Sequence, residues 1–368
     1  MSVRLLHTSD WHLGRRFFGR SLLSDQEYVL DQMLNLVRDL NPDILVVTGD
    51  IFDQRRPDEE ALALFHDTLN RLLGLGTVVI FLAGPSDDFR HLHLGARWVR
   101  DAGVYLFEDA TQVLSPLSLR GARDSFDVNT WCLPFPKPTE LSRPDEHPAL
   151  FSHSLVEKVV QRLNPNDVNL FLGYAWAQDA GRPEELGALV KPGGQPLEKR
   201  LLDFFDVSAL GGRHTPHSLG ANASYSGSLL CYEAESENTG RSVTFYDILS
   251  KGEVMVDQYS LRPRRALKVL TGSWEELMEK GRDLRSDDLI VLRSDELDLT
   301  PEQRADLRVL GPNIVSLEMP ALEGQLQEET DDPMPLLVRL FQKFAVETSG
   351  KELSPASLDL LLELEEKL

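Results

Sequence analysis

A short apolar segment near the start of the chain, Ile44–Val47, ends abruptly in glycine and carboxylates. An apolar run of this length, bounded by Pro42 and Gly49, is typical of a strand buried on both faces, as in a parallel sheet. The residues that follow it, Asp50 and Asp53, then lie at the carboxyl edge of that sheet, where open α/β folds bind ligands. The segment therefore predicts an α/β fold with a ligand site at one sheet edge.

A second apolar segment, residues 3–6, leads in the same way into Asp10 and His12. Because these two residues are two positions apart, their side chains point to the same side of extended backbone. A carboxylate and an imidazole at one strand end, with another carboxylate at the next, can hold a hard divalent cation. Asp is also a common N-cap, so Asp10 and Asp50 could instead cap the helices that follow the strands.

Apolar strands and amphipathic helices continue to alternate along the chain, which predicts parallel strand–helix–strand units with right-handed crossovers. The predicted helices span residues 22–40, 57–73 and 155–163, and the predicted strands span 77–82, 104–107, 168–172 and 204–210. Residues 113–133 are expected to form hairpin strands, and five prolines between 134 and 148 predict a loop. Two later segments, 225–228 and 243–248, are expected to complete a second sheet.

Composition limits the classes of protein to which the chain can belong. The 368 residues include 38 Lys and Arg and 59 Asp and Glu, which gives a formal net charge of −21. This negative charge argues against a protein that binds nucleic acid electrostatically over its whole surface. Any phosphate contact must then be local. Arg15, Arg16 and Arg20, which flank two phenylalanines, are the candidates for DNA or phosphate binding, and a solvated loop is the alternative.

The sequence also predicts the compartment. It contains no apolar run long enough to span a bilayer and no signal-peptide pattern. Its two cysteines, Cys132 and Cys231, lie far apart and form no metal-ligand pair, which suits a reducing environment. We therefore expect a cytoplasmic protein.

Several short strings, taken together, resemble the calcineurin-like metallophosphoesterases. These strings are Asp10-x-His12, Gly49–Asp50-x-x-Asp53, a glycine-centred turn after the third strand, and Ala209–Leu210–Gly211-x-x-His214. The longer strings SDWHLGR at 9–15, GDIFD at 49–53 and YSGS at 225–228 are similar to the SbcD family, the nuclease subunits of bacterial SbcCD complexes. The resemblance covers nearly the whole chain. It implies a sandwich of two mixed sheets flanked by helices, with a small α/β capping domain and C-terminal helices.

The resemblance implies a nuclease in which two Mn²⁺ or similar divalent ions activate water and clamp a DNA phosphodiester, while a histidine assists the leaving group. The positions that match the ligands of the first ion are all retained: Asp10, His12, Asp50 and His214. The positions that match the remaining ligands of the second ion hold Pro85, Tyr174 and Gly212, and the position of the catalytic histidine holds Ser86. We therefore expect at most one ion and weak or no nuclease activity.

The chemistry of the replaced positions supports this expectation. Proline and glycine side chains offer no ligand atom, and tyrosine is a poor ligand at neutral pH because its pKa is near 10. One alternative stays open: nearby residues could build a rearranged second site in an active metal-dependent DNA exonuclease or endonuclease. The residues that could supply it are Asp87, Asp88, His91, His93 and His217.

The resemblance also implies the domains and partners. The expected parts are the phosphoesterase domain (1–260), the capping domain (261–321), an acidic linker (322–335) and two helices (336–348 and 354–367). In the capping domain, strands at 267–270, 289–292 and 314–317 alternate with helices at 274–281 and 301–310. Arg262, Arg264 and Arg265 before it could contact a DNA backbone or form a solvated hinge.

In the SbcD family the C-terminal helices bind the coiled coil of the ATPase partner SbcC, the substrate is a DNA end, and the subunit is a homodimer. We expect the same of this chain, with no membrane partner. Packing of the two helices on their own domain is the alternative, since exposed apolar helix faces need some cover.

Deleting Pro335–Leu368 should leave the phosphoesterase domain folded and abolish binding to a coiled-coil ATPase, because the acidic linker isolates the two helices. Thermal melting of the truncated chain and its co-purification with the ATPase measure the two outcomes. A truncated chain that aggregates or loses its cooperative melt would assign the helices to the core instead.

Overall fold

The computed structural model describes residues 2–17, 19–89, 100–120, 126–141, 146–179, 196–233, 240–282, 287–295, 300, 314–318 and 357. The chain divides into two compact units, Met1–Met319 and Pro320–Leu368, and the elements described here belong to the first. The predicted helix at 301–310, the linker and, apart from residue 357, the C-terminal helices lie outside the described residues.

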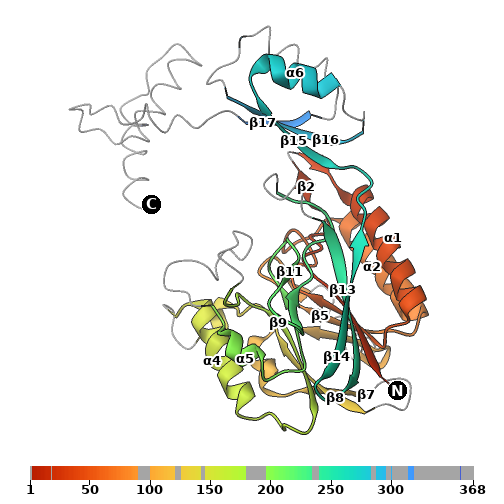
Figure 1. The fold of residues 1–368 in the computed structure, drawn as a ribbon, viewed down its shortest axis with the longest axis vertical. Coiled ribbons are helices and arrows are strands. Elements are labelled where there is room, and N and C mark those ends of the chain that lie inside the picture. Colours follow the sequence, from red (N-terminus) through yellow and green to blue (C-terminus); the bar gives the residue numbers. More distant parts are fainter. Residues whose placement is uncertain are drawn as a thin grey trace, which may run out of the picture. The chain divides into compact units, whose positions relative to one another are not determined.

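The first sheet is built around the segment that the sequence predicts as a buried strand. Its order is β14-β13-β1-β4-β5-β6, with the last four strands parallel. All five residues of β4 (Ile44–Thr48) are buried, as predicted. Helices α1 (Leu23–Leu40) and α2 (Glu59–Gly74) cover its outer face (Figure 1). The other strands are β1 (Val3–Thr8), β5 (Val78–Leu82), β6 (Val104–Phe107), β13 (Arg241–Ser250) and β14 (Glu253–Leu261).

Strand β13 corrects one expectation from the sequence. The segment 243–248 is a strand, but it lies in the first sheet, antiparallel to β1, rather than in the second. Val3 is opposite Ile248 and His7 is opposite Thr244. An alternating apolar pattern identifies a strand, whereas its partner depends on packing against distant residues.

The second sheet has the order β11-β12-β10-β9-β8-β7. Its central strands, β9 (Val168–Tyr174) and β10 (Val207–Gly211), are parallel and buried at every position. The expected hairpin is confirmed as the antiparallel pair β7 (Leu117–Arg120) and β8 (Asp127–Leu133). Strands β11 (His217–Ser218) and β12 (Ala223–Tyr225) complete the sheet, and α4 (Pro148–Val160) and α5 (Lys199–Leu202) lie on its outer side (Figure 1).

Helix α4 begins earlier than the sequence pattern indicates. It was expected at 155–163, but it starts at Pro148 and ends at Val160, so the proline-rich loop is shorter. Proline is favoured at the first helical position because its missing N–H would have no partner there. The His147 imidazole caps the helix by accepting the N–H of Ala149 at 3.1 Å.

The inner faces of the two sheets form one apolar layer, and each outer face forms another beneath its helices. Leu5, Val46 and Ile80 of the first sheet share the inner layer with Leu170 and Ala209 of the second. Alternate residues of each strand therefore enter different layers. The result is a four-layer helix–sheet–sheet–helix arrangement, which agrees with the predicted fold class.

After β14 the chain forms a small parallel sheet of β15 (Leu267–Gly272), β16 (Leu289–Ser294) and β17 (Ile314–Glu318), with α6 (Trp274–Arg282) between the first two strands in the sequence. These elements match those expected at 267–270, 274–281, 289–292 and 314–317. Within the described part of the chain, no helix combines the length and apolar character that a membrane span requires.

The two sheets touch backbone to backbone at the carboxyl ends of β10 and β4. A Cβ atom added at Gly211 would lie 1.6 Å from the carbonyl oxygen of Thr48, so no other residue fits there. Gly84, after β5, is equally restricted, because a Cβ there would lie 2.4 Å from Oδ1 of Asp50. The two sheets thus approach each other closely at the edge where the site residues lie.

Gly211→Ala should destabilise the protein by at least about 1–3 kcal/mol, because the added methyl must displace backbone rather than a flexible side chain. Gly74→Ala is the matched control: no heavy atom lies within 4 Å of its added Cβ, and alanine favours the helix that Gly74 ends. Urea unfolding of both variants measures the difference. Equal unfolding midpoints would mean that the sheets are not in this contact.

Candidate metal centre

Three residues at the strand ends have left-handed backbone: Asp10 (φ 51°), His12 (φ 46°) and Asp50 (φ 48°). This conformation costs of order 1–3 kcal/mol for a residue with a side chain, and such residues cluster at functional sites. The two loops are joined by backbone hydrogen bonds, from Asp10 N–H to Gly49 O at 3.0 Å and from His12 N–H to Asp50 O at 2.8 Å. The strain is therefore held by pairing between the loops.

Neither Asp10 nor Asp50 caps a helix. The N-cap residue of α1 is Leu22, which makes no side-chain cap, and the N-cap of α2 is Asp58, which accepts the N–H of Ala61. The capping alternative raised by the sequence is therefore wrong for both carboxylates.

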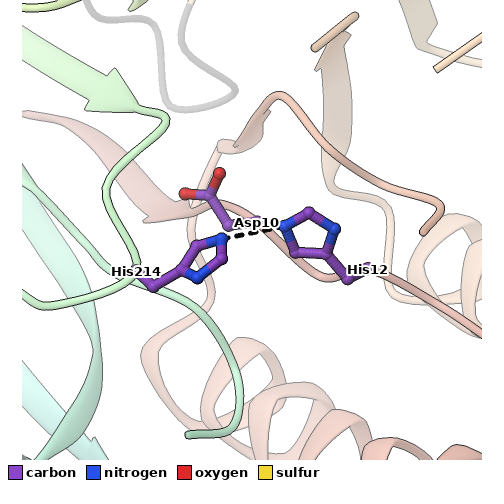
Figure 2. Close-up of side chains that lie close together, drawn as sticks. All are labelled: Asp10, His12 and His214. Carbon is purple, nitrogen blue, oxygen red and sulfur yellow. Dashed lines mark hydrogen bonds between the residues drawn. The ribbon is translucent and has the colours of Figure 1, made fainter. Parts of the chain in front are cut away.

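Asp10, His12 and His214 form a buried group whose potential ligand atoms all lie within 4.8 Å of one another (Figure 2). Nε2 of His12 is 2.9 Å from Nε2 of His214, and the rings meet edge to face. Adjacent ligands of an octahedral ion with bonds of about 2.1 Å lie about 3 Å apart, which is close to this spacing. The group could hold one divalent ion, with Asp50 outside it.

Glu233 orients His214 from the side opposite His12. Its carboxylate is hydrogen-bonded to Nδ1 of His214, which leaves Nε2 facing the group, as in carboxylate–histidine–metal arrangements. Burial raises the pKa of Glu233, but the hydrogen bond and charge of His214, together with the charges of Arg15 and Arg241, outweigh burial, so the net pKa is lowered. The sequence offers no signal for Glu233, because no motif or regular spacing connects it to His214.

Gln26 of α1 and Tyr232 fix the loop that carries His12. The Gln26 amide donates to the backbone oxygens of Trp11 at 3.1 Å and His12 at 2.7 Å, and accepts the N–H of Gly14 at 3.1 Å. The Tyr232 hydroxyl donates to the Trp11 oxygen as well. Sequence reasoning missed both residues, since they look like ordinary helix and loop positions.

Burial controls the protonation of the group. It raises the pKa of Asp10 to about 7, against the lowering effect of His214 and with a further raising contribution from Asp50. Burial also raises the pKa of Asp50, and burial, His214 and Arg15 lower the pKa of His12 well below its usual value. A neutral His12 imidazole beside buried carboxylates is suited to a cation, which binds the unprotonated imidazole and the ionised carboxylate.

Two residues expected at second-ion positions, Tyr174 and Gly212, and the residue expected at the position of the catalytic histidine, Ser86, contact the two aspartates. Oδ1 of Asp50 accepts the N–H of Ser86 at 3.1 Å and also its hydroxyl, and Oδ2 accepts the hydroxyl of Tyr174 at 2.8 Å. The N–H of Gly212 donates to both carboxylate oxygens of Asp10, at 3.1 and 3.2 Å. The Pro85 side chain is exposed.

The neighbours that could rebuild a second site have other contacts where they are described. The buried Asp87 carboxylate accepts three backbone N–H groups, from Gly84, Ile51 and Phe52, and therefore holds the turn together. Nε2 of His217 is 3.1 Å from the backbone oxygen of Asp179. Asp88 is half-buried, and His91 and His93 lie outside the described residues.

The three arginines proposed for DNA differ in their surroundings. Arg15 donates to Asp53 at 3.1 Å, and its guanidinium carbon is 5.0 Å from the centre of the Tyr232 ring. Arg16 is exposed on β2 (Arg16–Phe17), and Arg20 is half-buried on β3 (Arg20–Ser21). Arg16 is therefore the most accessible of the three.

Comparisons with known proteins agree with this arrangement. Residues 3–210 match the family model described as calcineurin-like phosphoesterase. The chain is 26% identical over 324 residues to the SbcD subunit of the nuclease SbcCD from Staphylococcus saprophyticus, covering 86% of this chain and 84% of that protein.

Two solved structures are also similar to the chain. TT1561 of Thermus thermophilus has 14% identity and a TM-score of 0.42, and the match covers 70% of this chain and 99% of that protein. A dimetal phosphatase from Danio rerio has 9% identity and a TM-score of 0.43, with the same two coverages.

Tyr174→Phe should destabilise the protein by about 1–3 kcal/mol, because it leaves a buried carboxylate oxygen of Asp50 without its donor. Tyr28→Phe removes the same hydroxyl from an exposed side chain of α1 and should change stability by no more than about 0.5 kcal/mol. Urea unfolding in the presence of a chelator measures both. Equal stabilities would contradict the hydrogen bond between Tyr174 and Asp50.

Proposed function

The chain belongs to the calcineurin-like phosphoesterase family, and from that premise we propose that it is an SbcD-like subunit that processes DNA ends with an SbcC-like coiled-coil ATPase. The observation that carries the proposal is the similarity to the SbcD subunit of an SbcCD nuclease across more than four-fifths of both chains. The SDWHLGR, GDIFD and YSGS strings and the small sheet that follows the phosphoesterase domain support the same assignment.

At the metal centre, Asp10, His12 and His214 would hold one Mn²⁺ or another divalent ion. The donor set fits, since it combines a buried carboxylate with two imidazole nitrogens that face each other. When bound, the ion would polarise a phosphodiester oxygen and a coordinated water. The protein's own part is to orient His214 through Glu233, to fix the His12 loop through Gln26, and to exclude bulk water by burial.

We propose that nuclease activity is weak or absent. Ser86 occupies the position of the family's acid, and its hydroxyl is within hydrogen-bond reach of Asp50 and of the Phe52 oxygen, 2.6 Å away. A serine hydroxyl also lacks the near-neutral pKa that makes histidine an effective proton donor to a leaving group. The alternative of an active exonuclease or endonuclease is favoured by the proximity of Asp10 and Asp50, whose raised pKa values would be relieved by nearby cations.

Other parts of the chain are proposed to bind the DNA and protein partners. Arg16, exposed beside the metal loop, is the best-placed arginine for a DNA phosphate. The C-terminal helices are proposed to bind the ATPase coiled coil, and two subunits are proposed to act together on DNA ends.

Changing four residues together, Pro85→Asn, Ser86→His, Tyr174→His and Gly212→His, should recover Mn²⁺-dependent degradation of linear duplex DNA, while each single change recovers little. The ligands of one ion act as a unit, and loss of a general acid typically costs about 10²–10⁴ in rate. Gel assays of the purified proteins measure it, with Asp10→Asn added to the quadruple variant as the metal-dead control.

The unmodified protein is the other arm of the same assay. If it degrades linear duplex DNA with Mn²⁺ and loses that activity on Asp50→Ala, the proposal of weak activity is wrong and the rearranged-site alternative replaces it.

A further inference from the structure

We propose that Asp50 does not bridge cations in this protein. Ser86 and Tyr174 hold its carboxylate as a hydrogen-bond acceptor, and Asp10, His12 and His214 alone form a site for one transition-metal cation. This inference deepens the proposed function and rests on metal binding at the same site, but it does not depend on the DNA or ATPase partners.

Most of the lone pairs of the Asp50 carboxylate already accept hydrogen bonds. An ionised carboxylate has about four acceptor positions, two on each oxygen. The N–H and hydroxyl of Ser86 both approach Oδ1, and the hydroxyl of Tyr174 lies 2.8 Å from Oδ2. These three donors leave one of the four acceptor positions unused. A bridging carboxylate must offer a lone pair to each of two cations and so needs two unused positions. Asp50 therefore cannot bridge while these donors stay in place.

Tyr174 is held in place by packing. Its side chain is fully buried, its ring meets Phe135 edge to face at 5.8 Å, and its strand, β9, is central in the second sheet. On the other side, a Cβ added at Gly49 would lie 2.2 Å from the ring. The ring therefore fills the space directly against the end of β4, next to Asp50.

Ser86 is held by the turn that contains it. Asp87, the next residue, accepts a backbone N–H from its own turn, that of Gly84 at 2.8 Å, and one from the loop after β4, that of Phe52 at 3.0 Å. The Ser86 hydroxyl has one proton and two acceptors in reach, Asp50 and the Phe52 oxygen. A carboxylate is the stronger acceptor, so the proton favours Asp50.

The three remaining ligands are oriented independently of Asp50. Two N–H contacts from Gly212 fix the Asp10 carboxylate, and Glu233 fixes the His214 ring. Two imidazoles and one carboxylate with open positions are a ligand set that binds first-row transition cations. The expected occupant is one such ion, with its open positions available to water or a phosphate oxygen.

Cobalt(II) tests this, because its visible absorption reports its coordination number and ligand set. The metal-free full chain should bind one equivalent of Co²⁺. Asp50→Asn should leave the shape and intensity of the spectrum unchanged, because Asp50 is not a ligand of the ion. Asparagine keeps one acceptor oxygen for the N–H and hydroxyl of Ser86, and its amide N–H can donate to the Tyr174 hydroxyl. Asp10→Asn should change the spectrum and weaken Co²⁺ binding by at least about tenfold.

The variant Asp53→Asn is the control for the loss of one negative charge near the site. Asp53 is on the same loop as Asp50, and its Oδ1 lies 3.6 Å from Nδ1 of His12, outside the ligand group. Affinity changes shared by Asp50→Asn and Asp53→Asn then reflect charge alone. The combined variant Tyr174→Phe and Ser86→Ala should free Asp50, so its Co²⁺ spectrum should gain a ligand or it should bind a second equivalent.

Two bound Co²⁺ ions per chain, an altered spectrum in Asp50→Asn, or an unchanged spectrum in the combined variant would each overturn the inference, as would no Co²⁺ binding at all. The stoichiometry of the unmodified protein decides the matter even if a variant fails to fold. Binding of the metal-free protein to DNA ends and to the ATPase tests the proposed function separately.

Discussion

The approach of two backbones, at Gly211 of β10 and Thr48 of β4, sets the geometry of the rest of the site. It is possible because Gly211 has no side chain, and a Cβ there would overlap the Thr48 oxygen. The loop after β10 carries His214, and the loops after β1 and β4 carry Asp10, His12 and Asp50. A wider gap between the sheets would separate His214 from Asp10 and His12, because His214 lies 202 positions from His12 in the chain and follows a strand of the other sheet.

The same edge collects four carboxylates, and each has a different kind of partner. Asp87 accepts backbone N–H groups, Asp53 pairs with Arg15, and Asp50 accepts Ser86 and Tyr174. Asp10 has the Gly212 N–H and faces two imidazoles. Because an unpartnered buried charge is costly, this division of partners explains how so many acids can share a buried region. It also leaves Asp10 as the carboxylate best placed to meet a cation.

Backbone strain and hydrogen bonding are balanced locally. Three left-handed residues cost of order 1–3 kcal/mol each, and they persist because the two loops pair with each other and with Gln26 and Tyr232. Tyr174 and Ser86 contribute in the same way, by donating to the buried carboxylate of Asp50.

The sequence by itself determined the alternating strands and helices from β1 to β5 and the strand β6, because their apolar periods are strong and their partners are near in the chain. The motif strings also predicted that Asp10, His12, Asp50 and His214 form one ligand set, and the structure groups Asp10, His12 and His214. The sequence did not locate the start of α4, where proline is compatible with a first turn, or the partner of β13.

Only the tertiary structure decided which groups touch Asp50. From the sequence, Tyr174 is expected at a ligand position and Ser86 at the position of the catalytic histidine. Tyr174 lies 124 positions from Asp50, and no local pattern predicts that its hydroxyl reaches that carboxylate. Glu233, Gln26 and Tyr232 are hidden for the same reason. A hydrogen bond between distant residues depends on how the sheets pack, and that packing is not encoded in any one segment.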